Sequence, residues 1–462
     1  MSRAWTDLSR WVAAHQRPVA LGLLGLVAVL TVVAGVLAVG LMRGLLPTGA
    51  GPSDTPSPTL LSSETPTPTP LSSRAASPTA TATEETVPTP TPLSDVGLAE
   101  GWVEVGSFGG EGTIDAVHDV VRAPFGLLAA GVHIDTRNLP VFGPLPQHGR
   151  IWLSSDGRSW EDVTPEGGTF AESSVYDLVV LADGAVVALV QVSSFGEDNP
   201  TEAYAAWETA DGRTWTGVEE MSAGNGPILN VVHGAAGYLA WRPVAENGGV
   251  ELWHSVDGRT YQLTTVIPEG RAVASMDAGP DGFVVVSRSV EGSASSVVYA
   301  SGDGVDWFEA PGPADAVAGV APIGPDWVGL DGTFGDGEEA TWVSANGLDW
   351  AASGSMPRRT ESLGDDATCT EFTSQLLSSG SLAVASTQWS YPCGEGHVQH
   401  FGAAHVTADG TTWAALPFAA GGLVVDGSTR GTTVNAGLDL EDGTLLAGEK
   451  DYRATFWFRP AD

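Results

Sequence analysis

The sequence predicts an all-β fold, a seven-bladed β-propeller closed by its own N-terminal strand. Three observations support this prediction: a seven-residue phrase that occurs six times, seven short apolar hairpins, and one unpaired strand-like segment near each end of the propeller region. The phrase, Ser/Thr-x-Asp/Asn-Gly-x-x-Trp/Tyr, recurs at intervals of roughly 45 to 60 residues, which indicates a repeat architecture. Its central residues are Asp156, Asp211, Asp257, Asp303, Asn346 and Asp409.

The repeat phrase predicts a tight turn between two strands. Gly adopts positive φ at little cost, and Asp or Asn accepts backbone hydrogen bonds within the turn. Five copies carry a large aromatic residue four positions before the centre, as Trp152 does, and all six carry one four positions after it, as Trp160 does. We therefore expect structural turns whose aromatic residues pack between neighbouring blades, and not a ligand site.

Seven inner hairpins accompany only six repeat phrases, and the two ends of the region account for the difference. The last hairpin is followed by a third strand, residues 454–458, without a fourth, whereas residues 101–105 resemble a fourth strand without three before it. We expect the two segments to pair in a seventh blade, because ring closure removes an exposed sheet edge. The inner turns contain Gly126, Gly184, Gly237, Gly282, Asp326, Gly380 and Gly443.

The repeat phrase closely resembles the Asp-box, or bacterial neuraminidase repeat, of a family of β-propellers. The resemblance extends over about residues 101–462 and implies the propeller fold. The same box occurs in sialidases, in other glycoside hydrolases, in sorting receptors and in assembly factors, so the fold alone does not define an activity.

Residues 18–42 contain no charge and are long enough to cross a bilayer of about 30 Å as a helix. Arg3, Arg10 and Arg17 precede this segment, which predicts that residues 1–17 are cytoplasmic and that the propeller is extracellular. The expected location is the plasma membrane, with a single pass. A cleaved signal peptide is the alternative, although the apolar run exceeds the roughly 7–15 residues of a signal core.

Residues 43–97 are rich in Pro, Thr and Ser, and no apolar core can form from them. We expect a disordered, extended stalk that separates the membrane from the propeller domain at residues 98–462.

The two cysteines, Cys369 and Cys393, lie symmetrically about the sixth inner turn. An exported domain permits a disulfide, and we expect them to be bonded; two free thiols in protein isolated without reductant would contradict this. The alternative joins Cys393 to His397 and His400 as metal ligands, but a usual zinc site needs further ligands from elsewhere. We predict no metal and no cofactor.

The net charge of −36 excludes several partners. Nucleic acid binding requires basic patches that displace counterions, and close contact with anionic lipid is equally disfavoured. The membrane is therefore expected to contact only residues 18–42. The Asp-Gly pairs also lack the alternating oxygen ligands of a calcium loop.

In a propeller the turns after strands one and three share one face, so the loops after strands two and four form the opposite face, which we call the ligand face. Spacings between inner turns and repeat phrases predict longer loops after strand two in blades one, two and six, clustered on one side of the ring. Loops of this kind commonly carry function. The candidate residues are Asp135, Arg137, Asn138, His148, Glu197, Asp198, Trp389, Tyr391, His397 and His400, with Arg271 and Arg430 from other loops on this face.

We expect a binding module for a protein or glycan. The alternative is a sialidase-like exo-glycosidase that hydrolyses glycan termini, for which the resemblance implies three arginines on a carboxylate, a Tyr nucleophile with a Glu, and an Asp. The segment from Arg137 to Pro140 has one residue too many for the usual Arg-Ile-Pro-like motif, and no Tyr–Glu pair is evident from spacing. Arg271, Arg358, Arg359 and Arg430 are the other possible clamp residues.

Overall fold

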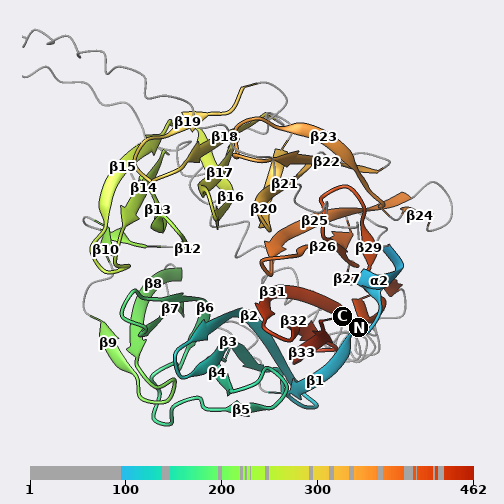
Figure 1. Ribbon diagram of the computed structural model, residues 1–462. Coiled ribbons are helices and arrows are strands. Elements are labelled where there is room, and N and C mark those ends of the chain that lie inside the picture. The colour runs from blue at the N-terminus through green and yellow to red at the C-terminus, as the bar shows by residue number, and fades with distance from the viewer. Residues whose placement is uncertain are drawn as a thin grey trace, which may run out of the picture.

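Seven antiparallel sheets surround a central axis in the computed structural model (Figure 1). The structure describes residues 95–461 except 138–145, 196–199, 219–221, 224–225, 229, 245–248, 291–294, 312–316, 332–337, 359, 363–367, 390–398, 402, 420–421 and 425–430. The all-β, seven-bladed propeller predicted from the repeats is confirmed.

Each of the first three blades is a consecutive four-stranded meander, with its first strand nearest the axis (Figure 1). Blade one contains β2 (Thr113–Ala123), β3 (Gly126–Asp135), β4 (Gln147–Ser154) and β5 (Trp160–Asp162). Blade two contains β6 (Ser173–Val180), β7 (Val186–Phe195), β8 (Pro200–Thr209) and β9 (Thr216–Val218). Blade three contains β12 (Asn230–Gly234), β13 (Gly237–Pro243), β14 (Val250–Ser255) and β15 (Gln262–Ile267).

The next three blades repeat this order, and short accessory elements lie beside them. Blade four contains β16 (Arg271–Gly279), β17 (Gly282–Ser289), β18 (Ser296–Ser301) and β19 (Phe308–Glu309). Blade five contains β20 (Val317–Ile323), β21 (Asp326–Asp331), β22 (Glu339–Ser344) and β23 (Ala351–Met356). Blade six contains β25 (Thr368–Ser378), β26 (Ala383–Trp389), β28 (Ala404–Thr407) and β29 (Ala414–Ala415), with β24 (Thr360–Ser362) paired to the first residues of β25. The accessory elements are β10 (Ser222–Ala223) paired with β11 (Gly226–Pro227), β27 (Gln399–Phe401) paired with β30 (Gly422–Val424), and the short helix η2 (Pro417–Ala419).

Blade seven joins the two ends of the propeller, as predicted. It contains β31 (Thr432–Leu440), β32 (Gly443–Lys450), β33 (Arg453–Pro460) and, as its outer strand, β1 (Val103–Phe108). Figure 1 shows β1, drawn in blue, beside the red β33. The register pairs Glu104 with Trp457 and Phe108 with Ala454, so β1 is the fourth strand of this sheet.

The apolar core is divided among the seven junctions between blades, with one buried cluster at each. The second strand of a blade is buried on both faces, which explains its continuous apolar run. In β17, for example, Phe283 and Val285 pack against blade three, whereas Val284 and Val286 pack against blade five. Because alternate side chains of a strand point to opposite faces, one strand supplies two junctions.

The repeat phrases form the predicted turns. In blade three the Ser255 hydroxyl accepts a hydrogen bond from the Gly258 N–H at 2.9 Å, and Asp257 Oδ1 accepts the N–H groups of Arg259 and Thr260 at 2.8 and 2.9 Å. The repeat Gly has φ between +68° and +77° in all six turns. These bonds stabilise ionised Asp257, so its pKa is lowered.

The repeat Gly also lies directly against the preceding blade. A Cβ on Gly258 would be 2.7 Å from Leu181 of blade two, and one on Gly304 would be 2.3 Å from His254 of blade three. Gly is therefore required both for its positive φ and for its lack of a side chain.

Blade seven has no repeat phrase, and another segment fills its junction with blade six. The short helix α2 (Asp95–Ala99) places Leu98, 3% exposed, in the apolar cluster there. The Trp102 indole N–H donates to the Leu98 carbonyl at 3.0 Å, and Phe418 stacks on Trp457 at 4.6 Å. The sequence did not predict this helix, whose first residues lie within the segment assigned to the stalk.

Side chains of several inner strands bind the backbone of the next blade. Asp119 accepts the Leu178 N–H at 2.9 Å, and Asp177 accepts the Val231 N–H at 3.0 Å. Across the closing junction, the Asn435 side-chain amide donates to the Val117 carbonyl at 2.8 Å. These bonds form a second set of links between blades, close to the axis.

The predicted membrane span at residues 18–42 lies outside the described residues, as do the cytoplasmic segment and nearly all of the predicted stalk. Among the helices that the structure describes, none is long and apolar enough to cross a membrane. The predicted disulfide also remains a prediction: the Cys369 backbone pairs with Glu361 in β24, its side chain is not described, and Cys393 lies outside the described residues.

Removal of the closing segment should destabilise the ring. Deletion of residues 98–106 removes Leu98, Trp102 and residues 103–106 of β1, so an edge of β33 and the junction of blades six and seven become exposed. We expect a fall in melting temperature of more than about 10 °C, or aggregation, measured by differential scanning fluorimetry. A shortened protein that melts like the full chain would contradict closure by β1.

The repeat turns should contribute stability. Replacement of Asp257 and Gly258 by Ala should lower the free energy of unfolding by roughly 1–3 kcal/mol, because two N–H groups lose their acceptor and a Cβ meets Leu181. The control is Asp257→Asn, since Asn346 occupies the same place in blade five and accepts the same two bonds. Equal urea midpoints for the Ala variant and the control would show that this turn carries little stability.

Candidate functional site

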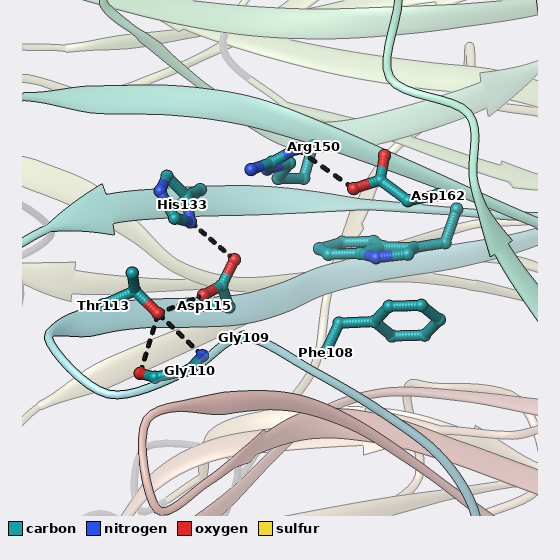
Figure 2. Close-up of a pocket in the computed structure, with 9 residues that line it drawn as sticks. Phe108, Gly109, Gly110, Thr113, Asp115, His133, Arg150 and Asp162 are labelled. Carbon is teal, nitrogen blue, oxygen red and sulfur yellow. Dashed lines mark hydrogen bonds and ion pairs between the residues drawn. The ribbon is translucent and has the colours of Figure 1, made fainter.

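A pocket of about 270 Å³ lies between blade seven and blade one, at the strand ends that belong to the ligand face. Figure 2 shows the residues that line it. The pocket lies above the junction of blades seven and one, where the connection from β1 to β2 enters blade one. The register places it opposite the repeat turn of the same blade: Asp115 pairs with His133 at one end of β3, whereas Leu127 at the other end pairs with Ser154 of the repeat phrase. The lining residues are Phe108, Gly109, Gly110, Thr113, Asp115, His133, Arg150, Trp152 and Asp162.

Two polar pairs form the walls of this pocket (Figure 2). His133 Nδ1 lies 2.8 Å from Asp115 Oδ1, and the Thr113 hydroxyl donates to Asp115 Oδ2 at 2.9 Å. Arg150 Nη1 donates to Asp162 Oδ2 at 3.0 Å. Asp115 is only 3% exposed, so its two donors satisfy a carboxylate that has little access to water.

The strand register of blade one brings these side chains together. Thr113 and Asp115 are two positions apart in β2, so their side chains point to the same side of the sheet, and Asp115 is paired directly with His133. Trp152 is paired with Asp162 across β4 and β5. The pocket is therefore built on regular strands, which hold side chains more firmly than loops do.

Aromatic rings and glycines complete the pocket. Trp152 is fully buried and its ring centroid lies 5.9 Å from that of the half-buried Phe108. Gly109 has φ of +114°, and a Cβ there would be 2.6 Å from Asp115 Oδ2. At Gly110 a Cβ would meet nothing within 4 Å, so the connection leaves open space beside the polar pairs.

The turn between β32 and β33 of blade seven contacts the backbone of β2 beside the pocket. Its two central residues, Asp451 and Tyr452, have φ of 50° and 67°, the left-handed conformation that two-residue hairpins usually fill with Asn or Gly. The Tyr452 carbonyl accepts the Asp115 N–H at 2.8 Å. Non-glycine residues in this conformation cost of order 1–3 kcal/mol each and are found preferentially at functional sites.

Carboxyl groups dominate the electrostatics beside the pocket. The pKa of Glu449 is raised to about 7, chiefly by burial and to a smaller extent by the charges of Asp115 and Asp451, against a backbone hydrogen bond from Tyr452. Burial also raises the pKa of the Tyr452 hydroxyl, with smaller contributions from Glu449 and Asp451. The region therefore disfavours additional negative charge.

Of the residues predicted from the ligand-face loops, three lie near this pocket. Asp135 and Arg137 form an ion pair at 2.9 Å beside it, and these hydrogen bonds lower the pKa of Asp135 to about 2. His148 is exposed and its ring stacks on His133, with 6.4 Å between centroids. Arg271 lies far around the ring, in blade four, where it donates to the Ser287 carbonyl and hydroxyl at 3.2 Å.

The other predicted residues are not placed. Trp389 and His400 have their backbones in β26 and β27, and their side chains are not described. Asn138, Glu197, Asp198, Tyr391, His397 and Arg430 lie outside the described residues. In blade two the additional residues lengthen the hairpin of β7 and β8, which pair as far as Phe195 and Pro200, so the predicted long loop is largely strand.

Sequence reasoning missed Thr113, Asp115, Arg150 and Asp162 as candidate residues. The signal that could have indicated them is the segment from Phe108 to Gly112, which has three glycines in five residues and connects the closing strand to blade one. In the described part of the chain, no group of three or more His, Cys, Asp or Glu residues is arranged to hold a metal ion.

Comparisons with known proteins show distant fold similarity. No family model and no curated protein matches the chain. Similar solved structures include a protein of unknown function from Dyadobacter fermentans, at 14% identity over 78% of this chain and 100% of the other, with a TM-score of 0.37. A protein from Lactobacillus plantarum has 14% identity over 72% and 92%, with a TM-score of 0.38. A glycosyl hydrolase from Bacteroides ovatus has 11% identity over 80% and 94%, with a TM-score of 0.32. At these identities and scores, none supports a functional inference.

The raised pKa of Glu449 predicts a pH dependence of stability. Between about pH 4.5 and 7 folded Glu449 keeps a proton that the unfolded chain has released, so the free energy of unfolding falls as pH rises through this window. Asp277, whose pKa burial raises to about 7, acts in the same direction. Glu449→Gln should reduce the loss between pH 5 and 8 by on the order of 1–2 kcal/mol, measured by urea unfolding at several pH values. Parallel pH profiles for the variant and the parent would contradict this assignment.

Proposed function

We propose that this chain is a membrane-anchored Asp-box propeller that binds a protein or glycan outside the cytoplasm, through its ligand face. The observation that carries the proposal is the pocket between blades seven and one, where Asp115, His133, Arg150 and Asp162 converge beside aromatic side chains. A concave site with a few convergent polar groups is the usual form of a small-ligand site.

The opposite face supports this assignment by contrast. There the polar atoms of the repeat turns are used within the protein: the Ser154 hydroxyl binds the Gly157 N–H at 2.9 Å, and Asp156 Oδ1 binds two further N–H groups at 2.9 and 2.8 Å. These groups hold the turns together, whereas the strand ends of blade one direct polar side chains into a cavity.

The membrane anchor at residues 18–42 is proposed from the sequence. Its length without charge and the preceding arginines support a cytoplasmic N-terminus and an exported propeller. Protease added to intact cells should then remove the propeller from the cell surface. A propeller protected until the cells are lysed would contradict this orientation.

A sialidase-like exo-glycosidase is the second candidate, favoured by Tyr452 beside Glu449. Its arginines support it poorly. Arg137 is paired with Asp135, Arg271 with Ser287 in blade four, and Arg358 with Glu339 of blade five at 3.3 Å. They belong to separate blades and separate partners, so none is presented with another to a single carboxylate. The raised pKa of Tyr452 also opposes its use as a nucleophile, which needs a hydroxyl that loses its proton readily.

A glycan array and a fluorogenic sialoside distinguish these functions. We expect the full-length protein, in a detergent without a sugar head group, to bind glycans and to leave the sialoside intact. Asp115→Asn should weaken binding tenfold or more, because a charge-assisted hydrogen bond contributes roughly 1.5–3 kcal/mol. Asp257→Asn on the repeat face is the control and should bind as the parent does.

Three results would contradict the binding proposal. If Asp257→Asn lost binding and Asp115→Asn kept it, the binding site would lie on the repeat face and not on the ligand face. Sialoside hydrolysis that Asp115→Asn abolishes would favour the enzyme. A ligand on this face would be excluded if no glycan on the array bound and if a photo-crosslinker at position 148 captured no more protein than one at position 213 on the repeat face.

A further inference from the structure

The charges of the pocket are already matched within it. Asp162 Oδ2 accepts from Arg150, and its Oδ1 accepts the Thr164 N–H at 3.0 Å. Both oxygens of Asp115 likewise have donors, from His133 and Thr113. A ligand cation would find no free carboxylate here, and a ligand anion would find only a guanidinium that already has an anionic partner.

The surroundings disfavour an anion further. Arg150 is the only Arg or Lys among the residues that line the pocket in the described part of the chain, whereas Asp115 and Asp162 both line it. Glu449 and Asp451 lie nearby, and the chain as a whole carries a net charge of −36. A sugar that bears a carboxylate is therefore the wrong ligand for this pocket, and a neutral molecule fits it better.

The remaining hydrogen-bonding capacity suits hydroxyl groups. Each carboxylate oxygen can accept a second bond, and the Arg150 guanidinium has further N–H groups besides the one that Nη1 donates to Asp162. His133 Nδ1 lies against Asp115 Oδ1, so Nε2 is the ring nitrogen that is left for a ligand. Donors and acceptors thus alternate around the cavity, and a hydroxyl both donates and accepts, so two neighbouring hydroxyls can bridge Arg150 and Asp162.

The size and apolar surface of the pocket limit the ligand to one ring. Its 270 Å³ lies just below the range of roughly 300–1,000 Å³ typical of small-molecule sites. Phe108 offers an apolar face against which the C–H groups of a sugar can pack. An oligosaccharide or a peptide would have to extend beyond the cavity.

We propose that this pocket binds one neutral sugar ring through two adjacent hydroxyls, held between Arg150 and Asp162, at an end or branch of a glycan. This inference rests on the proposed function and specifies the chemistry of its ligand. The short β1–β2 connection, with Gly109 against Asp115 and Gly110 beside open space, gives the ring its room.

Isothermal titration and saturation-transfer NMR of the full-length protein, in a detergent without a sugar head group, test this inference. The probes are the methyl pyranosides of glucose, galactose and mannose, their monodeoxy analogues, and the methyl glycoside of N-acetylneuraminic acid. We expect saturable binding of at least one neutral glycoside with a Kd of roughly 0.1–10 mM, as for a ligand of this size. Removal of either contacting hydroxyl should weaken binding tenfold or more, and the sialoside should not bind.

Two adjacent residues of β5 provide matched variants. Asp162→Asn should weaken the bound glycoside at least tenfold, because it removes the charge opposite Arg150. Glu161→Gln is the control: Glu161 forms an ion pair with Arg213 of blade two at 2.5 Å, points away from the pocket, and should leave binding unchanged. Melting temperatures within about 2 °C of the parent would show that both variants fold.

The outcomes separate this inference from the proposed function. It is overturned if no neutral glycoside binds, if the sialoside binds more tightly than every neutral glycoside, or if Glu161→Gln and Asp162→Asn have equal effects. Should Asp115→Asn nevertheless abolish binding on the glycan array, the ligand face would remain the binding face and only the single neutral ring would be excluded. If Asp115→Asn also leaves binding on the array unchanged, both the proposed function and the inference of a single neutral ring are contradicted.

Discussion

The fold depends on a contact that requires the absence of a side chain. In each of six turns the repeat Gly lies against the preceding blade, and a Cβ added to it would be only 2.3 to 2.9 Å from the nearest atom of that blade. Because the second strands are buried on both faces, no blade has a core of its own, and the apolar clusters exist only where two blades meet. The ring is stable as a whole, in the manner of repeat proteins in which neighbouring units complete each other.

Closure by β1 also explains where the pocket lies. The connection from β1 to β2 is short and rich in Gly, and Gly110 has nothing within 4 Å of where a Cβ would be. Bulkier residues in this connection would cover the ends of β2, β3 and β4. At the junction of blades seven and one, Trp152 and Phe456 belong to a buried apolar cluster. The pocket lies at the end of the same junction on the ligand face. Packing and cavity occupy different depths of one junction.

The sequence predicts the fold well because the repeat turn is a local signal. Gly258 and its counterparts need positive φ wherever they occur, and seven hairpins with two unpaired ends allow few closures. The pocket was harder to predict because Asp115, Arg150 and Asp162 come from three strands and are joined only by register. Only Asp135, Arg137 and His148, which lie beside the pocket, were expected. Helix α2 was missed because its five residues follow a Pro-rich segment without an apolar period.

The scarcity of basic residues determines how the carboxyl groups are satisfied. Acidic residues outnumber Lys and Arg by 56 to 20, so many carboxyls bind backbone N–H groups: two of these lower the pKa of exposed Asp211 to about 2, whereas burial raises that of Glu449 to about 7. Arg213 and Arg259 join carboxylates of the preceding blades on the repeat face. Partly exposed ion pairs contribute only about 0–1 kcal/mol each, so the pair of Arg150 with Asp162 adds little stability. Arg150 and Asp162 both line the cavity, so the pair lies where it could contact the ligand that we propose.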